Sequence, residues 1–391
     1  MRILSAIKFI VGAIFIYICL FSQAHAFDTK AKAAYVIDQT SGTILLSKNS
    51  DLPLPPASMS KLMTLYMTFE FIKAGRLGLD EKLPVSKNAA KYTGSTMFLN
   101  PTDRVAVVDL LRGIIVLSGN DACAVIAEAL SPDGTEAGFA KIMTERGRQI
   151  GLENSTFKNS NGWPADGHQM SVRDLGILAG RLISDFPEYY PMFAEQIYEF
   201  DGRAPANNRN RNPLLGLGIG ADGLKTGHTQ EAGYGLVGSA KQDGRRIIFV
   251  LSGLASQEER AQEAESIVKW AFRQFVMKKF APGGSEIGKA KVWNGNSRHV
   301  SLVLENDLNV MLPVLSSGKP SFSIEYIGPI KAPIAKGDKI AELVIETESL
   351  PETRHSLLAG DNISSGGFFI QVRTAGQYLI NMLFKDTEGN L

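Results

Sequence analysis

The sequence predicts an α/β (α+β) domain followed by a second, smaller all-β domain. Helix-like and strand-like segments alternate from residue 27 to about residue 280. After the segment KKFAPGG, short alternating strands such as HVSLVLE and KIAELVIETE follow one another, with turn residues between them. A chain of 391 residues is long enough for two domains with separate cores. We therefore expect one domain over residues 27–280 and the second over residues 281–364.

Local patterns predict the elements of the first domain one by one. Two apolar runs around a short turn indicate a hairpin, and apolar residues at steps of three and four indicate a helix. In chain order, the expected elements are a β-hairpin over residues 33–47, a helix from about Ser58 to Ala74, helices over 105–117 and 121–130, a hairpin over 233–254 with an Asp-Gly turn, and an amphipathic helix over 258–276.

The first 26 residues have the pattern of a secretory signal peptide. Two basic residues precede an apolar run from Phe9 to Phe21, and Ala-His-Ala follows. A short basic region, an apolar stretch of about 13 residues and an A-x-A site predict cleavage after Ala26. The alternative is a retained membrane helix, but a spanning helix needs about 20 apolar residues. We therefore expect residues 1–26 to be removed and the protein to be exported.

The C-terminal segment, residues 365–391, changes character again. Its apolar residues recur at steps of three and four, while Arg373, Gln377 and Asn381 make it a poor spanning segment. This pattern favours an amphipathic helix that anchors the protein by lying in the membrane surface. The alternative is a terminal helix that docks on its own domain or on a second copy. Gly376 weakens such a helix by about 1 kcal/mol.

Composition excludes several functions. A formal charge of +1 offers no electrostatic reason to bind nucleic acid. Once Cys19 leaves with the signal peptide, only Cys123 remains, so no internal disulfide can form, and Cys123 is expected in a buried helix. The histidines are too scattered for a metal cluster. We expect no metal and no cofactor.

Two other catalytic signatures are absent or out of place. No serine lies in G-x-S-x-G, so there is no α/β-hydrolase nucleophile elbow. One G-x-G-x-x-G spans residues 218–223, but it runs into LKTGHT, which does not look helical. A dinucleotide loop should open a helix, so we interpret this match as an ordinary loop.

Three short motifs that together mark penicillin-interacting serine acyl-transferases occur in the expected order. They are S-x-x-K at Ser58–Lys61, S-x-N at Ser118–Asn120 and K-T-G at Lys225–Gly227. Each motif alone is weak, since S-x-x-K occurs five times in the chain. The match at Ser58 has both companions, and Pro55-Pro56 precedes it as a helix start. Ser58 is therefore the candidate nucleophile, the alternative being a serine that only caps a helix.

The context of each motif agrees with that chemistry. Ser58 would lie at the positive end of a helix dipole, with Lys61 one turn further on and on the same face. The S-x-N motif falls in a tight connection between two expected helices, where short polar side chains can point into a cleft. The K-T-G motif begins an expected strand, along which Gly227 would leave room for a substrate.

The segments PASMSKLMT, LSGNDACAVIAE, NRN at residues 210–212, DGLKTGHT and AGYGLVGSA carry a family resemblance. The sequence resembles low-molecular-mass penicillin-binding proteins of the kind of penicillin-binding proteins 5 and 6, serine-type D-alanyl-D-alanine carboxypeptidases, over essentially the whole chain. The resemblance implies a β-lactamase/transpeptidase-like domain in which a helical subdomain lies beside an antiparallel sheet. It also implies a role in cell-wall maturation and cell shape, in the periplasm, at the outer face of the inner membrane.

The resemblance implies a role for each motif residue. Ser58 would attack the carbonyl of the penultimate D-alanine of a peptidoglycan stem peptide that ends in D-Ala-D-Ala, and water would then hydrolyse the acyl-enzyme. Lys61 would act as the base, provided that burial and the neighbouring Lys225 cation lower its pKa towards neutrality. Ser118 would relay a proton to the leaving amine, and Asn120 would hold the geometry.

The remaining site residues would bind the substrate. The backbone N–H groups of Ser58 and His228 would form the oxyanion hole. Thr226 and Arg211, the arginine of the NRN segment, would bind the terminal carboxylate, Arg211 through a bidentate pair. The NRN segment could equally be a turn with an exposed arginine. β-Lactam antibiotics would acylate the same serine.

Other functions stay open at this point. A β-lactamase shares all three motifs, but the class A enzymes use a glutamate to activate the deacylating water, and the comparable stretch NGWPADGHQMSVRD contains none. A D,D-endopeptidase that cuts cross-links is a second alternative. A third is a catalytically silent envelope scaffold that binds peptidoglycan through the β domain, although the intact motifs argue against it. The oligomeric state is open, and a homodimer is one alternative.

Overall fold

The structure is a computed structural model that describes residues 27–203, 206–315, 319–347, 350–367 and 372. The predicted signal peptide lies outside the described residues, as does almost all of the predicted C-terminal helix. The chain divides into two compact units, residues 1–273 and 274–391. We describe each unit by itself.

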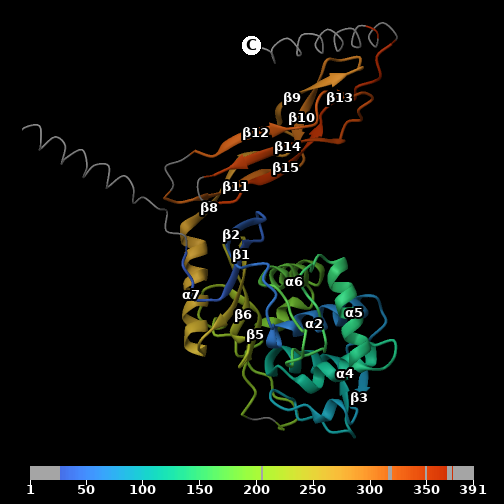
Figure 1. Ribbon diagram of the computed structural model, residues 1–391, viewed down its shortest axis with the longest axis vertical. Helices are drawn as coiled ribbons and strands as arrows, with labels where there is room; N and C mark the ends of the chain where they lie inside the picture. Colours follow the sequence, from blue (N-terminus) through green and yellow to red (C-terminus); the bar gives the residue numbers. More distant parts are fainter. Residues whose placement is uncertain (1–26, 204–205, 316–318, 348–349, 368–371, 373–391) are drawn as a thin grey trace, which may run out of the picture. The chain divides into compact units, whose positions relative to one another are not determined.

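A five-stranded antiparallel sheet forms the centre of the first unit (Figure 1). The strand order is β2-β1-β7-β6-β5, so the first hairpin of this unit pairs with the last hairpin of the same unit. Both predicted hairpins are present in this sheet. The strands are β1 (Ala33–Asp38), β2 (Thr43–Lys48), β5 (Ala221–Thr229), β6 (Gly233–Gln242) and β7 (Arg245–Leu254).

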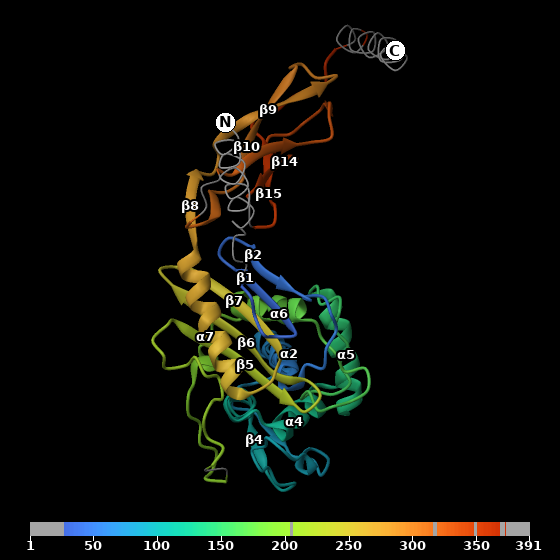
Figure 2. The ribbon, with the colours of Figure 1, turned by 60° about the vertical axis from the view of Figure 1, so that its left-hand side comes forward.

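Helices cover both faces of this sheet. Helix α7 lies on one face, and α6 and α2 lie on the other (Figure 2). The helical elements are η1 (Ala57–Ser60), α2 (Lys61–Lys73), η2 (Ala89–Lys91), α3 (Val107–Arg112), η3 (Gly113–Leu117), α4 (Asn120–Leu130), α5 (Glu136–Gln149), α6 (Val172–Asp185), η4 (Tyr190–Ala194) and α7 (Gln257–Gln274).

Two predicted helix boundaries are wrong. The helix expected over 105–117 begins only at Val107, because the preceding residues form β4 (Arg104–Ala106), which pairs with β3 (Lys82–Pro84). The C-terminal helix of this unit ends at Gln274, and Phe275 starts the next strand. In both places backbone pairing with a distant strand overrides a helical apolar pattern.

Helix α2 is buried over most of its length. Every residue from Lys61 to Phe69 is buried, polar ones included. Buried hydroxyls need partners, and Thr64 donates to the carbonyl of Ser160 at 2.6 Å, while Thr68 donates to the carbonyl of Thr64 at 2.6 Å. The N-terminal end of α2 is therefore held rigidly inside the unit.

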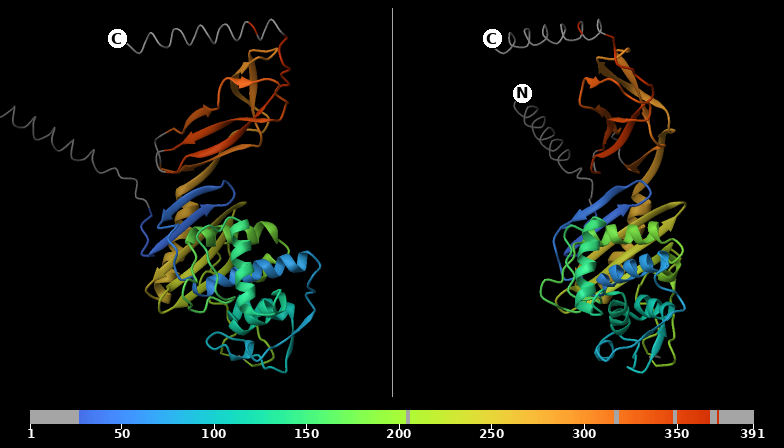
Figure 3. Two further views of the ribbon diagram at one scale, coloured as in Figure 1. Left: turned by 45° about the vertical axis from the view of Figure 1, so that its right-hand side comes forward. Right: turned by 90° about the vertical axis from the view of Figure 1, so that its right-hand side faces the viewer.

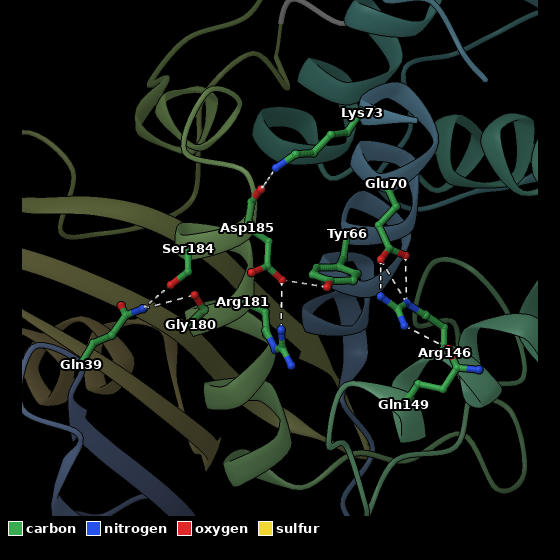
Figure 4. Close-up of polar contacts among 10 residues, drawn as sticks. All are labelled: Gln39, Tyr66, Glu70, Lys73, Arg146, Gln149, Gly180, Arg181, Ser184 and Asp185. Carbon is green, nitrogen blue, oxygen red and sulfur yellow. Dashed lines mark hydrogen bonds and ion pairs between the residues drawn. The ribbon is translucent and has the colours of Figure 1, made fainter. Parts of the chain in front are cut away.

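Polar contacts tie the other end of α2 to its neighbours (Figure 4). Arg146 of α5 binds Glu70 through Nε and Nη2, and the Tyr66 hydroxyl donates to Asp185 of α6 at 2.9 Å. The side chains of Glu70 and Arg146 are 26% and 33% exposed. An ion pair this exposed contributes at most about 1 kcal/mol.

The elements from β8 to β15, which make up the described part of the second unit, are all strands, as predicted. Figure 3 shows them. A six-stranded sheet has the order β12-β14-β15-β10-β9-β13, and β11 pairs with β8. The alternate residues of β10 that point into the core of this unit are Val300, Leu302 and Leu304. The strands are β8 (Phe275–Ala281), β9 (Glu286–Trp293), β10 (His299–Leu304), β11 (Leu308–Pro313), β12 (Ser321–Glu325), β13 (Ile330–Lys331), β14 (Lys339–Glu346) and β15 (Thr353–Ala359).

Within the described residues, no helix combines the length and the hydropathy that crossing a membrane requires.

Candidate active site

Ser58 lies in the short 3₁₀ turn η1, which leads directly into α2. The residue before it, Ala57, has a positive φ of 49°, a conformation that costs a non-glycine residue energy. Strand β5 packs against this turn at Gly227, where an added Cβ would lie 3.0 Å from the carbonyl oxygen of Pro56 and 3.0 Å from Met59. The structure thus gives Gly227 a different role from the predicted one: its missing side chain admits the nucleophile turn itself.

The Lys61 ammonium group makes three hydrogen bonds in the site. Nζ donates to Ser58 Oγ at 2.8 Å, to Asn120 Oδ1 at 2.8 Å and to the carbonyl oxygen of Asn161 at 2.5 Å. The side chain is fully buried. All three N–H donors are therefore used on uncharged oxygens. When Nζ loses a proton, the lone pair can face Ser58 while the other two bonds hold the amine in place.

Burial tunes the two lysines of the site. The pKa of Lys61 is lowered to about 8, mainly by burial and in part by the Arg211 cation, while Cys123, Asp121 and Glu136 oppose the shift. Burial also lowers the pKa of Lys225 well below its ordinary value, with help from Lys61. The two ammonium groups repel each other inside the protein. This repulsion favours the neutral form of one of them close to neutral pH.

The S-x-N motif follows the π-helical turn η3 and begins α4. Ser118 takes the left-handed conformation, with φ 61° and ψ 37°, and its buried hydroxyl has no hydrogen-bond partner among the described residues. Asn120 is fixed on two sides, because its backbone N–H donates to the carbonyl of Ser95 at 2.7 Å and its Nδ2 donates to that of Thr93 at 2.9 Å. Its Oδ1 therefore points at Lys61, and the Ser118 hydroxyl is left available for a ligand.

Strand β5 carries the third motif along the same site. The K-T-G motif lies inside the strand and does not begin it, since β5 starts at Ala221. Of the G-x-G-x-x-G match, residues 218–220 precede β5 and residues 221–223 form its start, so the match is only partly a loop, although no helix follows it. Lys225 and Thr226 are buried, whereas His228 is exposed and stacks on Tyr234 of β6 with 3.9 Å between ring centroids.

Two arginines add positive charge beside Lys225. Arg211 donates to the carbonyl of Leu117 at 2.7 Å and to Asn207 Oδ1 at 3.2 Å, and burial lowers its pKa. The residue is exposed, as the alternative allowed, but these two hydrogen bonds hold its side chain in place. Arg260 of α7 is 4% exposed and donates to the carbonyl of Arg211 at 3.4 Å. Its Nε has no hydrogen-bond partner among the described residues.

Sequence reasoning missed Arg260 and Asn161. Arg260 lies in a segment rich in glutamate and arginine, where nothing marks one arginine as buried. Asn161 acts through its backbone carbonyl, which any residue type would provide. Lys61 contacts both Ser58 and Asn120 directly, and the Arg211 cation lies close enough to Lys225 to lower its pKa.

Comparisons with known proteins identify the family of this chain. A family model described as D-alanyl-D-alanine carboxypeptidase, peptidase S11, matches residues 21–255, and one described as penicillin-binding protein 5, C-terminal domain, matches residues 275–364. The chain is 33% identical to D-alanyl-D-alanine carboxypeptidase DacC of Escherichia coli, over 88% of this chain and 86% of the relative.

Solved structures extend the likeness to three dimensions. Penicillin-binding protein 5 of Haemophilus influenzae matches with a TM-score of 0.77 at 30% identity, over 88% of this chain and 100% of that chain. Penicillin-binding protein D2 of Listeria monocytogenes, solved in an ampicillin-bound form, matches with a TM-score of 0.56 at 31% identity, over 62% and 98%. The chain therefore belongs to the peptidase S11 family of D-alanyl-D-alanine carboxypeptidases and carries the C-terminal domain of penicillin-binding protein 5.

Proposed function

We propose that this chain removes the terminal D-alanine from peptidoglycan stem peptides through an acyl-enzyme on Ser58. The observation that carries the proposal is the Lys61 amine, buried, with a pKa of about 8 and 2.8 Å from Ser58 Oγ. A base poised near neutral pH beside a serine hydroxyl is what nucleophilic acyl transfer requires.

The reaction begins when neutral Lys61 accepts the hydroxyl proton of Ser58 as Oγ attacks the carbonyl carbon of the penultimate D-alanine. The carbonyl oxygen gains the negative charge, and the backbone N–H groups of Ser58 and His228 stabilise it. The C–N bond then breaks. The proton held by Lys61 passes through the Ser118 hydroxyl to the leaving amine, and D-alanine departs. Water hydrolyses the ester and restores Ser58.

The cationic groups near Thr226 would bind the terminal carboxylate of the substrate. Thr226 offers a hydroxyl group, and Arg211 offers a guanidinium group that supplies charge-assisted hydrogen bonds. Arg260 strengthens the positive potential from behind Arg211, to whose carbonyl it donates. This arrangement favours a free C-terminal carboxylate, and hence carboxypeptidase over endopeptidase activity.

β-Lactams would acylate the same serine, as binding of ampicillin by a relative supports. Rapid release of the drug needs a base for water, as the glutamate of class A β-lactamases provides. Glu136 and Asp121 are acids near Lys61. Glu136 already accepts from the Tyr92 hydroxyl at 2.6 Å and from Ser160 Oγ at 2.5 Å, and Asp121 accepts from the backbone N–H groups of Met97 and Leu99. A carboxylate so occupied is a poor water activator, so we propose a long-lived penicilloyl-enzyme.

We also propose that the protein is exported to the periplasm and serves cell-wall maturation there. The pattern of residues 1–26 supports export, and the amphipathic pattern of residues 365–391 supports attachment to the outer face of the inner membrane. Fractionation of cells that produce the chain with and without residues 365–391 tests both statements. Release of the shortened form into the soluble periplasmic fraction is the expected result.

The proposed activity is tested with Ser58→Ala beside the parent. Brief exposure to benzylpenicillin should add the mass of one penicilloyl group to the parent and nothing to the variant, measured as intact mass. The parent should also release D-alanine from a pentapeptide ending in D-Ala-D-Ala, and the variant should not. A folded parent that forms no adduct and releases no D-alanine would favour the scaffold alternative.

A further inference from the structure

The direction of the Lys61 lone pair depends on two oxygen atoms. When Nζ is neutral, its two N–H bonds go to Asn120 Oδ1 and to the carbonyl oxygen of Asn161, so that the lone pair faces Ser58 Oγ. A shift of either oxygen turns the lone pair away from the hydroxyl proton, and proton transfer needs a heavy-atom distance of about 2.6–3.2 Å. The residues that hold these two oxygens therefore bear on the reaction.

One oxygen of the Glu136 carboxylate lies on the Asn161 side of the amine. Glu136 is the first residue of α5, and its Oε1 accepts from the backbone N–H of Ser160 at 3.0 Å and from Ser160 Oγ at 2.5 Å. The carbonyl of Ser160 accepts from Thr64 of α2 at 2.6 Å. Ser160 is thus held at its N–H, its side chain and its carbonyl, and the next carbonyl along the chain is the one that Lys61 contacts.

The other oxygen of the same carboxylate lies on the Asn120 side. Oε2 of Glu136 accepts from the Tyr92 hydroxyl at 2.6 Å. The next residue, Thr93, accepts from Asn120 Nδ2 at 2.9 Å through its carbonyl oxygen. That bond turns Oδ1 of Asn120 towards Lys61. One carboxylate therefore connects the two segments that orient the amine.

A merely structural role for Glu136 would be to stabilise the start of α5, where a carboxylate interacts favourably with the helix dipole. That end of the helix is already capped by Thr135, whose Oγ1 accepts from the N–H of Gly138 at 2.9 Å. Both oxygens of Glu136 instead accept from residues outside α5. The side chain is therefore directed at the segments around the amine and not at its own helix.

The carboxylate also places a negative charge near the amine. Burial is the main cause that lowers the pKa of Lys61, and Glu136 is one of the groups that oppose it. The other charged or titratable groups that face the amine are Cys123, Arg211, Asp121, Lys225 and His168. Since Lys61 must be neutral to act as the base, loss of the Glu136 charge should move the pH profile of acylation to lower pH.

We propose, on the basis of the proposed function, that Glu136 is a positioning residue of the reaction. Its carboxylate fixes the carbonyl of Asn161 and the amide of Asn120 relative to each other. These two oxygens in turn hold the Lys61 lone pair on the Ser58 hydroxyl. Glu136 acts through them, because its own hydrogen bonds within the described residues go to neither Ser58 nor Lys61.

Two substitutions of Glu136 separate the geometry from the charge. Glu136→Ala removes both connections, so acylation by benzylpenicillin should slow about tenfold at high pH, where Lys61 is neutral. Glu136→Gln can keep both connections, since its amide oxygen accepts from Ser160 and its NH₂ group donates to the Tyr92 oxygen. This variant should recover most of the rate at high pH. In both variants the midpoint of the pH profile should move to lower pH.

A third substitution, Tyr92→Phe, removes one connection and leaves the charge in place. Acylation should slow about threefold, with the midpoint unchanged. The matched control is Tyr198→Phe, which removes a tyrosine hydroxyl that donates to Asp109 at 2.8 Å and should react at the parent rate. Asp109→Ala is the corresponding control for Glu136→Ala.

Thermal unfolding shows which variants fold. A folded Glu136→Ala variant with the parent rate at high pH would overturn the proposal and leave the proposed function intact. Equal slowing in Glu136→Gln and Glu136→Ala would assign the effect to the charge and would also overturn it. If Glu136→Ala does not fold, Tyr92→Phe decides, since a rate equal to that of Tyr198→Phe would again overturn the proposal. A folded parent that is not acylated would overturn both this proposal and the proposed function.

Discussion

Helix α2 carries a charged side chain near each end, and the two ends differ in how that charge is met. At the start, Lys61 is fully buried and donates only to uncharged oxygens. At the other end, Glu70 is partly exposed and is paired with Arg146. A buried charge without an opposite partner costs stability, whereas an exposed pair contributes little in either direction. The unpaired buried charge, which costs stability, lies at the active site. The exposed ion pair lies where α2 packs against α5.

The largest expected effect comes from removing the buried amine. Lys61→Met keeps the length of the side chain but removes the base, so acylation of Ser58 by benzylpenicillin should fall by about a thousandfold or more. The rate is measured by stopped-flow or by the time course of intact mass. Thermal unfolding of the same variant checks that it folds, since Asn120 and Asn161 lose a donor. A folded variant that is acylated at the parent rate would remove Lys61 from the mechanism.

A smaller effect follows from the pKa of the Lys61 amine, which is about 8. Below this pH, Lys61 carries its proton and cannot accept another, so acylation should slow as the pH falls and level off above it. The neutral fraction rises from about a tenth at pH 7 to about nine tenths at pH 9, which predicts an acylation rate about tenfold higher. The measurement is the second-order rate constant for benzylpenicillin from pH 6 to 9.5. A flat profile over this range, in protein that stays folded, would contradict the assignment of Lys61 as the base.

The smallest effect is expected at the far end of the helix. Glu70→Gln breaks the pair with Arg146 but leaves both side chains near water, so the free energy of unfolding should fall by about 1 kcal/mol or less. Acylation should be unchanged. Urea unfolding and the benzylpenicillin rate check the two statements. A tenfold loss of acylation in this variant would show that the two ends of α2 are coupled, and the contrast between them would not hold.

Much of the site could be predicted from short-range patterns. Ser58 and Lys61 are one turn apart, so helical geometry alone places them on one face, and the structure puts their atoms 2.8 Å apart. The fold class followed from the alternation of helix-like and strand-like segments before the all-strand region. These inferences succeed because they rest on interactions between residues that are near in sequence.

Other features depend on residues that meet only after folding. The helix expected over 105–117 starts late because Ala106 pairs with Lys82, which no local pattern indicates. Gly227 looked like space for substrate, yet its space is filled by Pro56 and Met59. Arg260 and the carbonyl of Asn161 reach the site from segments that carry no motif.

By itself, the sequence determined which functional groups are available: two serines, two lysines, an asparagine and a threonine in three motifs, because residue types and their local spacing are written in the chain. Only the tertiary structure decided the protonation and the orientation of these groups. Burial brings the pKa of Lys61 to about 8, and Asn120 and Asn161 orient its amine, because desolvation and hydrogen-bond direction depend on atoms from segments far apart in sequence.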